Sequence, residues 1–252
     1  MARFDGQVLL LTGAGSGIGR ATALKLAAEG ASIYLSDIVQ EGLEETVKLA
    51  NEAASSGAQI ESRVSDISDE TQAKASVAAC VERFGRLDTL CNNAGIIGYQ
   101  HTHEMTLDFW RRILSVNLDG TFLMTREAIP HLLESKGAIV NIGSTAGLAG
   151  LAYGSAYSAS KGAIHAFTRA IAVEYADRGL RANSIAPASI ETGMTKPVKM
   201  PKGANFALLE RLSSLQGVAG PEAVADLVLF LASDASSHIS GEEIRVDGAA
   251  LA

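Results

Sequence analysis

Short apolar runs with β-branched residues alternate along the chain with longer stretches of helical periodicity. Strands that alternate with helices form a mainly parallel sheet, joined by right-handed crossovers and covered by helices on both faces. We therefore predict an α/β fold with a doubly wound parallel sheet of about seven strands. The predicted strands are residues 8–12, 32–36, 59–64, 87–91, 138–142, 181–185 and 243–246.

Glycine marks most of the junctions between predicted helices and strands. It commonly ends helices because it adopts left-handed backbone angles without strain. Five glycines are predicted to cap helices in this way: Gly30, Gly57, Gly85, Gly137 and Gly179.

One long segment, at about 188–217, breaks the alternation. Its prolines, lysines and methionines interrupt any regular period until a short apolar stretch at 206–209. Long irregular connections in compact domains are more often functional or flexible than inert. We predict a single domain, residues 1–252, in which this segment is a lid over a site.

Composition and charge favour a small-molecule ligand. The 252 residues are 47% hydrophobic, and 21 basic against 28 acidic residues give a net charge of −7 without a basic cluster. This argues against nucleic acid or a membrane surface as a partner. The first residues lack the form of a secretory signal, and no segment has the length and hydrophobicity of a membrane span.

Cysteine and histidine usage gives no sign of a disulfide framework or a metal site. The only cysteines, Cys80 and Cys91, have neither C-x-x-C nor disulfide-framework spacing, which fits a reducing, cytoplasmic location. Both are expected in the core. No cysteine or acid spacing around His101 and His103 resembles a metal site, so we predict no metal.

A glycine-rich turn leads from the first predicted strand into a helix. Gly13, Gly17 and Gly19 form the pattern G-x-x-x-G-x-G, with Ser16 and Ile18 between them. Without β-carbons the backbone can approach a pyrophosphate, whose charge meets the positive end of the helix. The position between strand and helix favours a dinucleotide site over a plain tight turn.

Asp37 follows the second predicted strand, 20 residues after Gly17. A carboxylate there accepts the ribose hydroxyls of an adenosine and repels a 2′-phosphate. Neither Ser16 nor Ile38 provides a cation that would offset this repulsion, so NAD is favoured over NADP. The alternative is that Asp37 caps the following helix.

Asp66 follows the third predicted strand, with Ile67 beside it. Its side chain faces the adenine amine in one interpretation and caps a helix in the other, and the sequence supports the two equally.

Tyr157 and Lys161 are four residues apart, a spacing that places a phenol and an ammonium on one face of a helix. A cation beside the hydroxyl favours phenolate, so the pair is suited to proton transfer. Taken alone, the spacing favours a packed ring with a lysine reaching solvent over a catalytic pair.

Further motifs place this pair in a family context. T-G-A-G-S-G-I-G occupies 12–19, N-N-A-G occupies 92–95, and Ser144 follows the fifth predicted strand. With Tyr157-x-x-x-Lys161 and the closing S-G at 240–241, the chain resembles the short-chain dehydrogenase/reductase family over nearly its whole length. The resemblance implies a Rossmann-like fold that holds the dinucleotide and the catalytic residues in one domain.

The resemblance also implies catalytic roles. Tyr157 would be the general acid or base, and Lys161 would lower the pKa of the phenol and hold the nicotinamide ribose. Ser144 would hydrogen-bond the substrate oxygen. Asn117, inside the helical stretch 109–133, would open the helix and hold a water that links the lysine to solvent.

Two further segments match the family's cofactor contacts. Asn93, Ala94 and Gly95 would lie along the ribose, and Pro187, Ile190 and Thr192 would surround the nicotinamide. The chain departs from the family at Ala188, where glycine is usual, and an added methyl fits there if φ is negative.

Together these features predict an NAD(H)-dependent oxidoreductase that interconverts a secondary alcohol and a ketone. The alternatives are a non-redox epimerase or dehydratase on the same fold, and a catalytically silent NAD-binding regulatory protein. By resemblance, the assembly would be a homotetramer built on 109–133, 156–175 and the stretch near Val246. The candidate substrate pocket is largely apolar and suits an alicyclic alcohol, with Ile97, Tyr99, Leu148, Leu151, Tyr153, Met194 and Phe206 as candidate lining.

Overall fold

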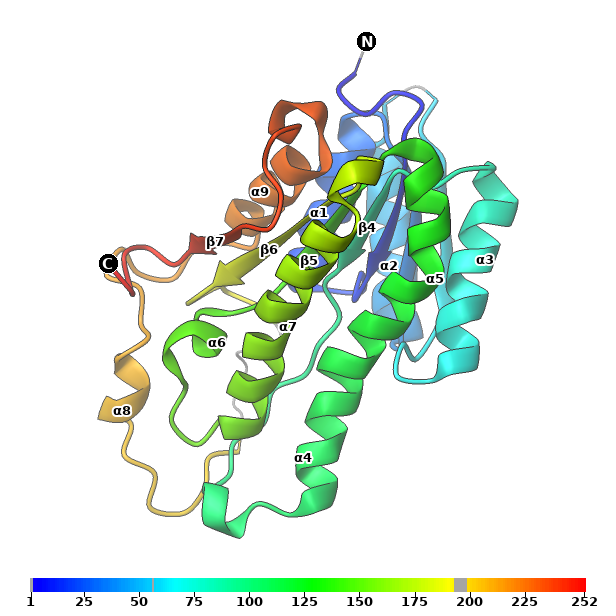
Figure 1. Ribbon diagram of the computed structural model, residues 1–252. Coiled ribbons are helices and arrows are strands. Elements are labelled where there is room, and N and C mark those ends of the chain that lie inside the picture. Colours follow the sequence, from blue (N-terminus) through cyan, green and yellow to red (C-terminus); the bar gives the residue numbers. More distant parts are fainter. Residues whose placement is uncertain (1, 56, 193–198) are drawn as a thin grey trace.

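The structure is a computed structural model that describes residues 2–55, 57–192 and 199–252. These residues form one seven-stranded sheet in the order β3-β2-β1-β4-β5-β6-β7 (Figure 1). All neighbouring strands are parallel, and the order reverses between β1 and β4, so the predicted doubly wound fold is confirmed. The strands are β1 (Val8–Thr12), β2 (Ser32–Asp37), β3 (Ile60–Val64), β4 (Thr89–Asn92), β5 (Ala138–Ile142), β6 (Arg181–Pro187) and β7 (Glu243–Val246).

Helices cover both faces of the sheet. One buried apolar cluster joins the sheet to α1, α2 and α9, and a second joins it to α3, α5 and α7. Figure 1 shows α7 and α5 side by side in front of the sheet. The α-helices are α1 (Gly17–Ala28), α2 (Gln40–Ala53), α3 (Glu70–Phe84), α4 (Leu107–Leu114), α5 (Gly120–Ser135), α6 (Thr145–Ala149), α7 (Ser155–Glu174), α8 (Ala207–Glu210) and α9 (Glu222–Ala232). Short 3₁₀ turns are η1 (Thr102–Glu104), η3 (Ala176–Arg178) and η5 (Asp234–Ser236), and η2 (Ser115–Asp119) is a π-helical turn.

The central strand β1 is apolar because both of its faces are covered. Leu9 and Leu11 pack into the cluster with α1, whereas Val8 and Leu10 pack into the cluster with α3. Successive side chains of a strand point to opposite faces, so both faces of this strand are apolar. The strand thereby holds the glycine turn that follows it at a fixed place above the core.

Several predicted strand ends are shifted by one or two residues. β4 begins at Thr89 and not at 87, because the Asp88 carboxylate accepts the Val8 N–H at 2.8 Å and so replaces a backbone ladder bond. β3 begins at 60 and not at 59, and β2 and β6 extend beyond their predicted ends to Asp37 and Pro187.

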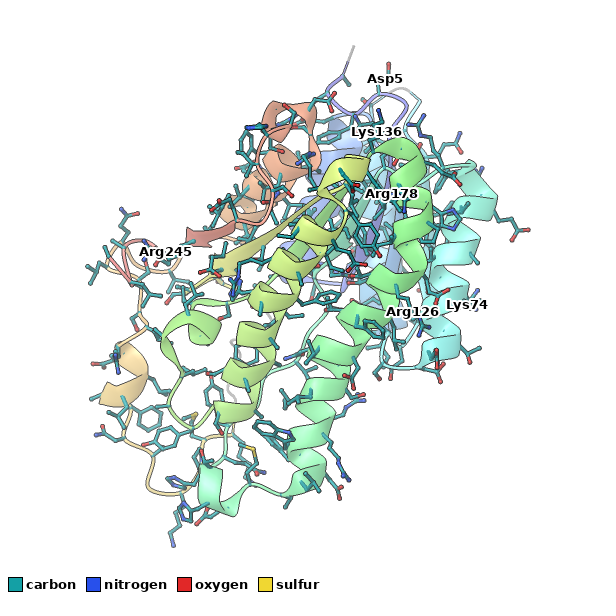
Figure 2. All side chains as sticks on the ribbon, viewed as in Figure 1. Asp5, Lys74, Arg126, Lys136, Arg178 and Arg245 are labelled. Atoms are coloured by element: carbon teal, nitrogen blue, oxygen red, sulfur yellow. The ribbon has the colours of Figure 1, made fainter. Side chains whose placement is uncertain are left out.

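The predicted cap at Gly137 is wrong. Lys136, labelled at the end of α5 in Figure 2, takes the left-handed conformation there with φ 51°. Gly137 is needed for another reason, because a β-carbon on it would lie 2.3 Å from the Asp88 carbonyl oxygen. Gly85 and Gly179 do cap helices in the left-handed region, as predicted.

Candidate active site

The carboxyl ends of the central strands open into a cavity of about 630 Å³. In doubly wound sheets, ligands bind at this edge, where the strand order reverses. The cavity brings together most of the predicted cofactor and catalytic residues. Those in its lining are Gly13, Ser16, Gly17, Ile18, Asp37, Asn93, Ala94, Gly95, Ser144, Tyr157, Lys161, Pro187, Ile190 and Thr192, whereas Gly19, Asp66, Ile67 and Asn117 lie outside it.

The glycine turn is built by close backbone approaches. Gly13 and Gly17 have φ of 65° and 51°, and a β-carbon on Gly13 would lie 2.7 Å from Ala94 Cα. Gly19 packs beneath the turn, where a β-carbon would lie 2.1 Å from the Gly13 carbonyl oxygen. Ser16 is the N-cap of α1 but its side chain makes no capping bond, so the turn offers backbone N–H groups and a positive helix end to an anion.

Asp37 is oriented by backbone amides at the rim of the cavity. Its Oδ2 accepts the Gly15 N–H at 2.7 Å and its Oδ1 accepts the Val39 N–H at 2.8 Å. The N-cap of α2 is Val39, so Asp37 does not cap that helix directly. Arg20, the cation nearest this turn in sequence, is engaged with the carbonyls of Gly15 and Gly42.

Asp66 and Ile67 serve local structure in this arrangement. The Asp66 Oδ1 accepts from the backbone N–H and the hydroxyl of Ser68, at 2.9 and 2.6 Å. Burial raises the pKa of Asp66, but these hydrogen bonds outweigh it and the pKa is lowered. Ile67 is buried against Gly120. The N-cap of α3 is Asp69, and contact of Asp66 with an adenine stays a prediction.

Asn93 ties the end of β4 to the glycine turn. Its Nδ2 donates to the carbonyls of Thr12 and Gly13 at 3.1 and 2.9 Å. The Thr12 hydroxyl in turn accepts the N–H groups of Asn93 and Ala94, both at 3.1 Å. These bonds hold two strand ends together across the point where the strand order reverses.

Ser144, Tyr157 and Lys161 meet at the other end of the cavity. Tyr157 and Lys161 come from α7 and are only 8% and 4% exposed. The Tyr157 phenol is hydrogen-bonded to the Ser144 hydroxyl. Lys161 Nζ donates to the Ile142 carbonyl oxygen at 2.6 Å and lies 5.9 Å from the centre of the Tyr157 ring.

Burial dominates the electrostatics of this cluster. It raises the pKa of Tyr157 to about 12, although the Ser144 hydrogen bond lowers it. It also lowers the pKa of Lys161 to about 8. Both shifts favour the neutral forms, because a charge is costly away from water. The lowering of the phenol's pKa by Lys161 stays a prediction.

Asn117 lies in the π-helical turn η2, which separates α4 from α5 within the single helix predicted at 109–133. Its Oδ1 accepts the Ile96 N–H at 2.8 Å, and its Nδ2 donates to the Ile96 carbonyl and the Ser160 hydroxyl. The side chain therefore joins the loop after β4 to the turn of α7 that carries Lys161. The linking water stays a prediction.

The segment after β6 lies against the glycine turn. Thr192 faces the glycine turn, since a β-carbon on Gly17 would lie 3.0 Å from its Cγ2. The Ala188 N–H donates to the Val246 carbonyl oxygen at 3.1 Å, and Ala188 is not among the residues with positive φ. Its methyl group is therefore accommodated where the family usually has glycine.

The structure sorts the substrate-pocket candidates. Ile97, Tyr99 and Leu151 line the cavity, whereas Leu148, Tyr153 and Phe206 do not, and Met194 lies outside the described residues. The Tyr153 hydroxyl instead accepts the Asn205 N–H at 2.8 Å. The segments expected to supply lining, 145–155 and the stretch after Ala188, contribute Thr145, Ala146, Ser189, Met200, Leu209, Leu212 and Ser213. Sequence reasoning missed Ile38, Val39, Ile142 and Gly143 as lining, although each ends or closely follows a strand.

The described ranges contain neither a metal site nor an activated thiol. No group of His, Cys, Asp and Glu within them could hold a metal ion. Burial raises the pKa of both Cys80 and Cys91 to about 12, which keeps them as thiols. Among the residues described, none of the helices combines the length and hydrophobicity needed to cross a membrane.

Comparison with known proteins gives consistent matches. A family model described as enoyl-(acyl carrier protein) reductase matches residues 13–249. The chain is 38% identical to meso-2,3-butanediol dehydrogenase of Serratia marcescens, over 99% of this chain and 96% of that protein. It is similar to the solved structure of levodione reductase, with TM-score 0.88, 37% identity and 98% of each chain covered. It is also similar to a short chain dehydrogenase from Mycobacterium paratuberculosis bound to NAD, with TM-score 0.89, 30% identity and 98% of each chain covered. This chain belongs to the short-chain dehydrogenase/reductase family.

Proposed function

We propose that this chain is an NAD(H)-dependent oxidoreductase that interconverts a secondary alcohol and a ketone by hydride transfer. The observation that carries the proposal is that one cavity holds the glycine turn, Asp37, and the Ser144, Tyr157 and Lys161 cluster. A dinucleotide at the turn and an alcohol at the phenol would therefore share one site.

The residues present fit a dinucleotide. The cradle at Gly13 and Gly17 lacks the β-carbons that would fill it, and the N-terminus of α1 faces it. Asp37 would accept the ribose hydroxyls, and the apolar Ile38 beside it supports NAD over NADP. When bound, NAD supplies the hydride acceptor for the oxidation.

The predicted cofactor residues would contact different parts of a bound NAD. Asn93, Ala94 and Gly95 would lie along the ribose, and Pro187, Ile190 and Thr192 would surround the carboxamide. Asp66 and Ile67 lie outside the cavity lining and would contact the adenine at its edge.

The chain's own residues would move the proton. Tyr157 would take the proton of the alcohol as its carbon loses hydride, and Ser144 would donate a hydrogen bond to the same substrate oxygen. Lys161, buried and bonded to Ile142, would hold the nicotinamide ribose beside the phenol. Asn117 would link Lys161 to solvent through a water.

The substrate end of the cavity favours an uncharged alcohol. Asp37 and Lys161 are the only charged residues of the described lining. Ile97, Leu151, Leu209 and Leu212 form an apolar wall that suits an alicyclic or short aliphatic alcohol. An anionic substrate would lack a cation for its charge, since Lys161 serves the phenol and the ribose.

We also propose a cytoplasmic homotetramer. Phe122 of α5 is 44% exposed, and its ring lies 6.4 Å from that of Phe167 on α7. An aromatic pair across two long helices, with Phe122 exposed and Phe167 partly buried, is suited to burial against a second copy. The two buried free thiols suit a reducing compartment.

The test is to incubate the purified protein with NAD or NADP and a panel of alcohols, including cyclohexanol and 2,3-butanediol, and to follow NADH absorbance. We expect reduction of NAD by a neutral secondary alcohol. An epimerase or dehydratase would convert its substrate without net NADH, and a silent regulatory protein would bind NAD without turnover. Either result would overturn the proposal.

A further inference from the structure

His165 lies on α7, one helical turn after Lys161 and two turns after Tyr157. It follows Tyr157 and Lys161 at the same spacing of four, so the three side chains share one face of the helix. It is 2% exposed, and it does not line the cavity. A buried imidazole in this place needs hydrogen-bond partners, because an unpaired polar group is costly in the core.

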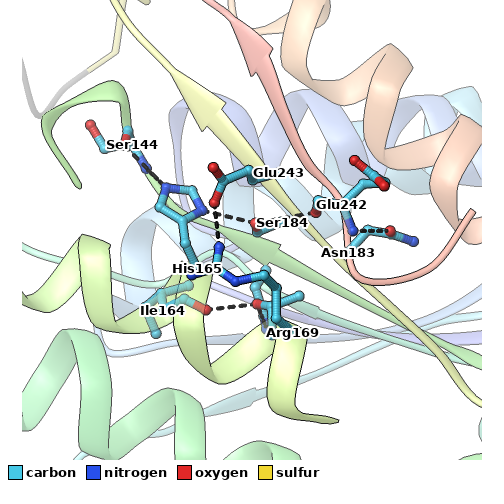
Figure 3. A network of polar contacts seen from close by, with 10 residues as sticks. Ser144, Ile164, His165, Arg169, Asn183, Ser184, Glu242 and Glu243 are labelled. Carbon is cyan, nitrogen blue, oxygen red and sulfur yellow. Dashed lines mark hydrogen bonds and ion pairs between the residues drawn. The ribbon is translucent and has the colours of Figure 1, made fainter. Parts of the chain in front are cut away.

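The His165 ring joins the middle of β6 to the segment just after β5 (Figure 3). Its Nδ1 lies 2.8 Å from the Ser184 Oγ on β6. Its Nε2 lies 3.2 Å from the Ser144 carbonyl oxygen and 3.4 Å from the Ser144 amide nitrogen, just after β5. With the proton on Nε2, the ring donates to the Ser144 carbonyl and accepts from the Ser184 hydroxyl. With the proton on Nδ1, it donates to the Ser184 hydroxyl and accepts the Ser144 N–H. Either neutral tautomer joins β6 to the Ser144 backbone.

The ring also packs directly against the peptide before Ser144. A β-carbon on Gly143 would lie 2.2 Å from the ring Cε1. Ser144 itself has extended backbone angles, φ −172° and ψ 152°, and begins α6 as its N-cap. The imidazole therefore contacts the backbone of this peptide, while the Ser144 side chain is hydrogen-bonded to the Tyr157 phenol.

We propose that His165 is a positioning residue that fixes the Gly143–Ser144 backbone so that the Ser144 hydroxyl meets both the phenol and the substrate oxygen. The role rests on the proposed function. His165 acts through Ser144 and does not touch the reacting atoms, since its ring lies outside the cavity lining.

Burial favours a neutral imidazole bridge over an acid or a base. Burial lowers the pKa of His165, and Lys161 and Arg169 on the same helix lower it further. The Ser144 carbonyl and Glu243 of β7 act in the opposite sense, and Glu243 is itself paired with Arg169 at 2.6 Å. The neutral imidazole has one donor and one acceptor, which match its two partners.

Three substitutions separate the two contacts of the ring. In His165→Gln the longer side chain can still donate to the Ser144 carbonyl, whereas in His165→Asn the shorter one reaches only toward Ser184. His165→Leu fills the space without either bond. With cyclohexanol and NAD, we expect kcat to fall about 10-fold in the Asn and Leu variants and less than about 3-fold in the Gln variant, with the Kd for NAD unchanged.

The pH profile distinguishes positioning from a merely structural role. Because the Ser144 hydrogen bond lowers the pKa of Tyr157, its loss moves the acid limb of kcat to higher pH in the Asn and Leu variants. Tyr99 and Lys161, the other titratable groups facing the phenol, are unchanged in all three proteins. Wild-type kcat and pH profile in the Asn variant, or a Gln variant as impaired as Leu, would overturn the proposal.

Ser184→Ala provides a second route if a His165 variant does not fold. It removes the partner of Nδ1 and leaves the imidazole in place, so we expect a smaller fall in kcat, about 3-fold, with the same direction of pH shift. An unchanged kcat and pH profile would contradict the bridge. If Tyr157→Phe keeps full turnover, the proposed function itself fails. If Tyr157→Phe is inactive and the His165 variants are unaffected, only the role of His165 fails.

Discussion

The two ends of the cavity are built on opposite principles. At the proposed nucleotide end, the turn between β1 and α1 depends on missing side chains, because Gly13 and Gly17 leave backbone N–H groups open to an anion. At the proposed catalytic end, α7 carries Tyr157 and Lys161, whose polar side chains are buried.

The difference lies in what each end demands of the fold. The nucleotide end needs space and a helix terminus, both of which a short local motif provides. The catalytic end needs desolvated groups paired with each other, so it depends on a strand end, a helix and a buried histidine packed together. A change at the first end should act on binding and stability, and a change at the second should act on turnover.

Tyr157→Phe is the strongest test of this division. Removing the hydroxyl removes the proton acceptor, and we expect kcat to fall about 1,000-fold while calorimetry gives an unchanged Kd for NAD. Tyr175→Phe, at the other end of the same helix, is the matched control and should keep full activity. Equal loss of NAD affinity and turnover in Tyr157→Phe would erase the distinction between the two ends.

Gly13→Ala tests the nucleotide end. The added carbon meets the Ala94 backbone in a residue with positive φ, so we expect the free energy of unfolding to fall by roughly 3 kcal/mol. Gly85→Ala is the control, because Gly85 also has positive φ but nothing within 4 Å of the added carbon, and should cost about 1 kcal/mol. Urea unfolding measures both, and equal losses would mean that the close approach is unimportant.

Stability against pH sharpens the account of the catalytic end. The pKa of Lys161 is about 8 in the folded protein and ~10.4 in the unfolded chain, so between these values the unfolded chain binds more protons and stability rises with pH. Lys161→Met should lack this rise of roughly 2 kcal/mol between about pH 8 and pH 10.

The comparison with Lys161→Met isolates this lysine from other titrating groups. Cys80 and Cys91, whose pKa burial raises to about 12, lower stability over the same range in both proteins and cancel in the difference. Tyr157, also raised to about 12, begins to contribute only above its unfolded pKa of ~10. Identical pH dependence of urea unfolding in the two proteins would show that Lys161 is not desolvated.

Asp37→Ala should have the smallest effect on catalysis, and the quantity to compare is the choice between NAD and NADP. Losing the carboxylate removes the repulsion of a 2′-phosphate, so the ratio of kcat/KM with NAD to that with NADP should fall about 10-fold. Asp66→Ala is the control and should leave this ratio unchanged, even if adenine contact weakens NAD binding. An unchanged ratio in Asp37→Ala would count against the ribose role.

Most of the site could be predicted because its motifs are local. The spacing of Tyr157 and Lys161 fixes their common helix face, and the glycine turn follows a strand by sequence alone. The start of β4 and the reason for a glycine at 137 were harder to predict, because each depends on a contact of Asp88 with a residue distant in the sequence. Asp66 has the right position after a strand, yet its carboxylate bonds Ser68 and stays outside the cavity lining.

The sequence by itself determined the order of strands and helices, the glycine turn and the pairing of a phenol with a lysine, since each depends on residues close along the chain. Only the tertiary structure decided which strand ends meet, how deeply Tyr157 and Lys161 are buried, and that His165 supports Ser144. Those features depend on packing between segments remote in sequence, and burial in turn sets the direction of each pKa shift.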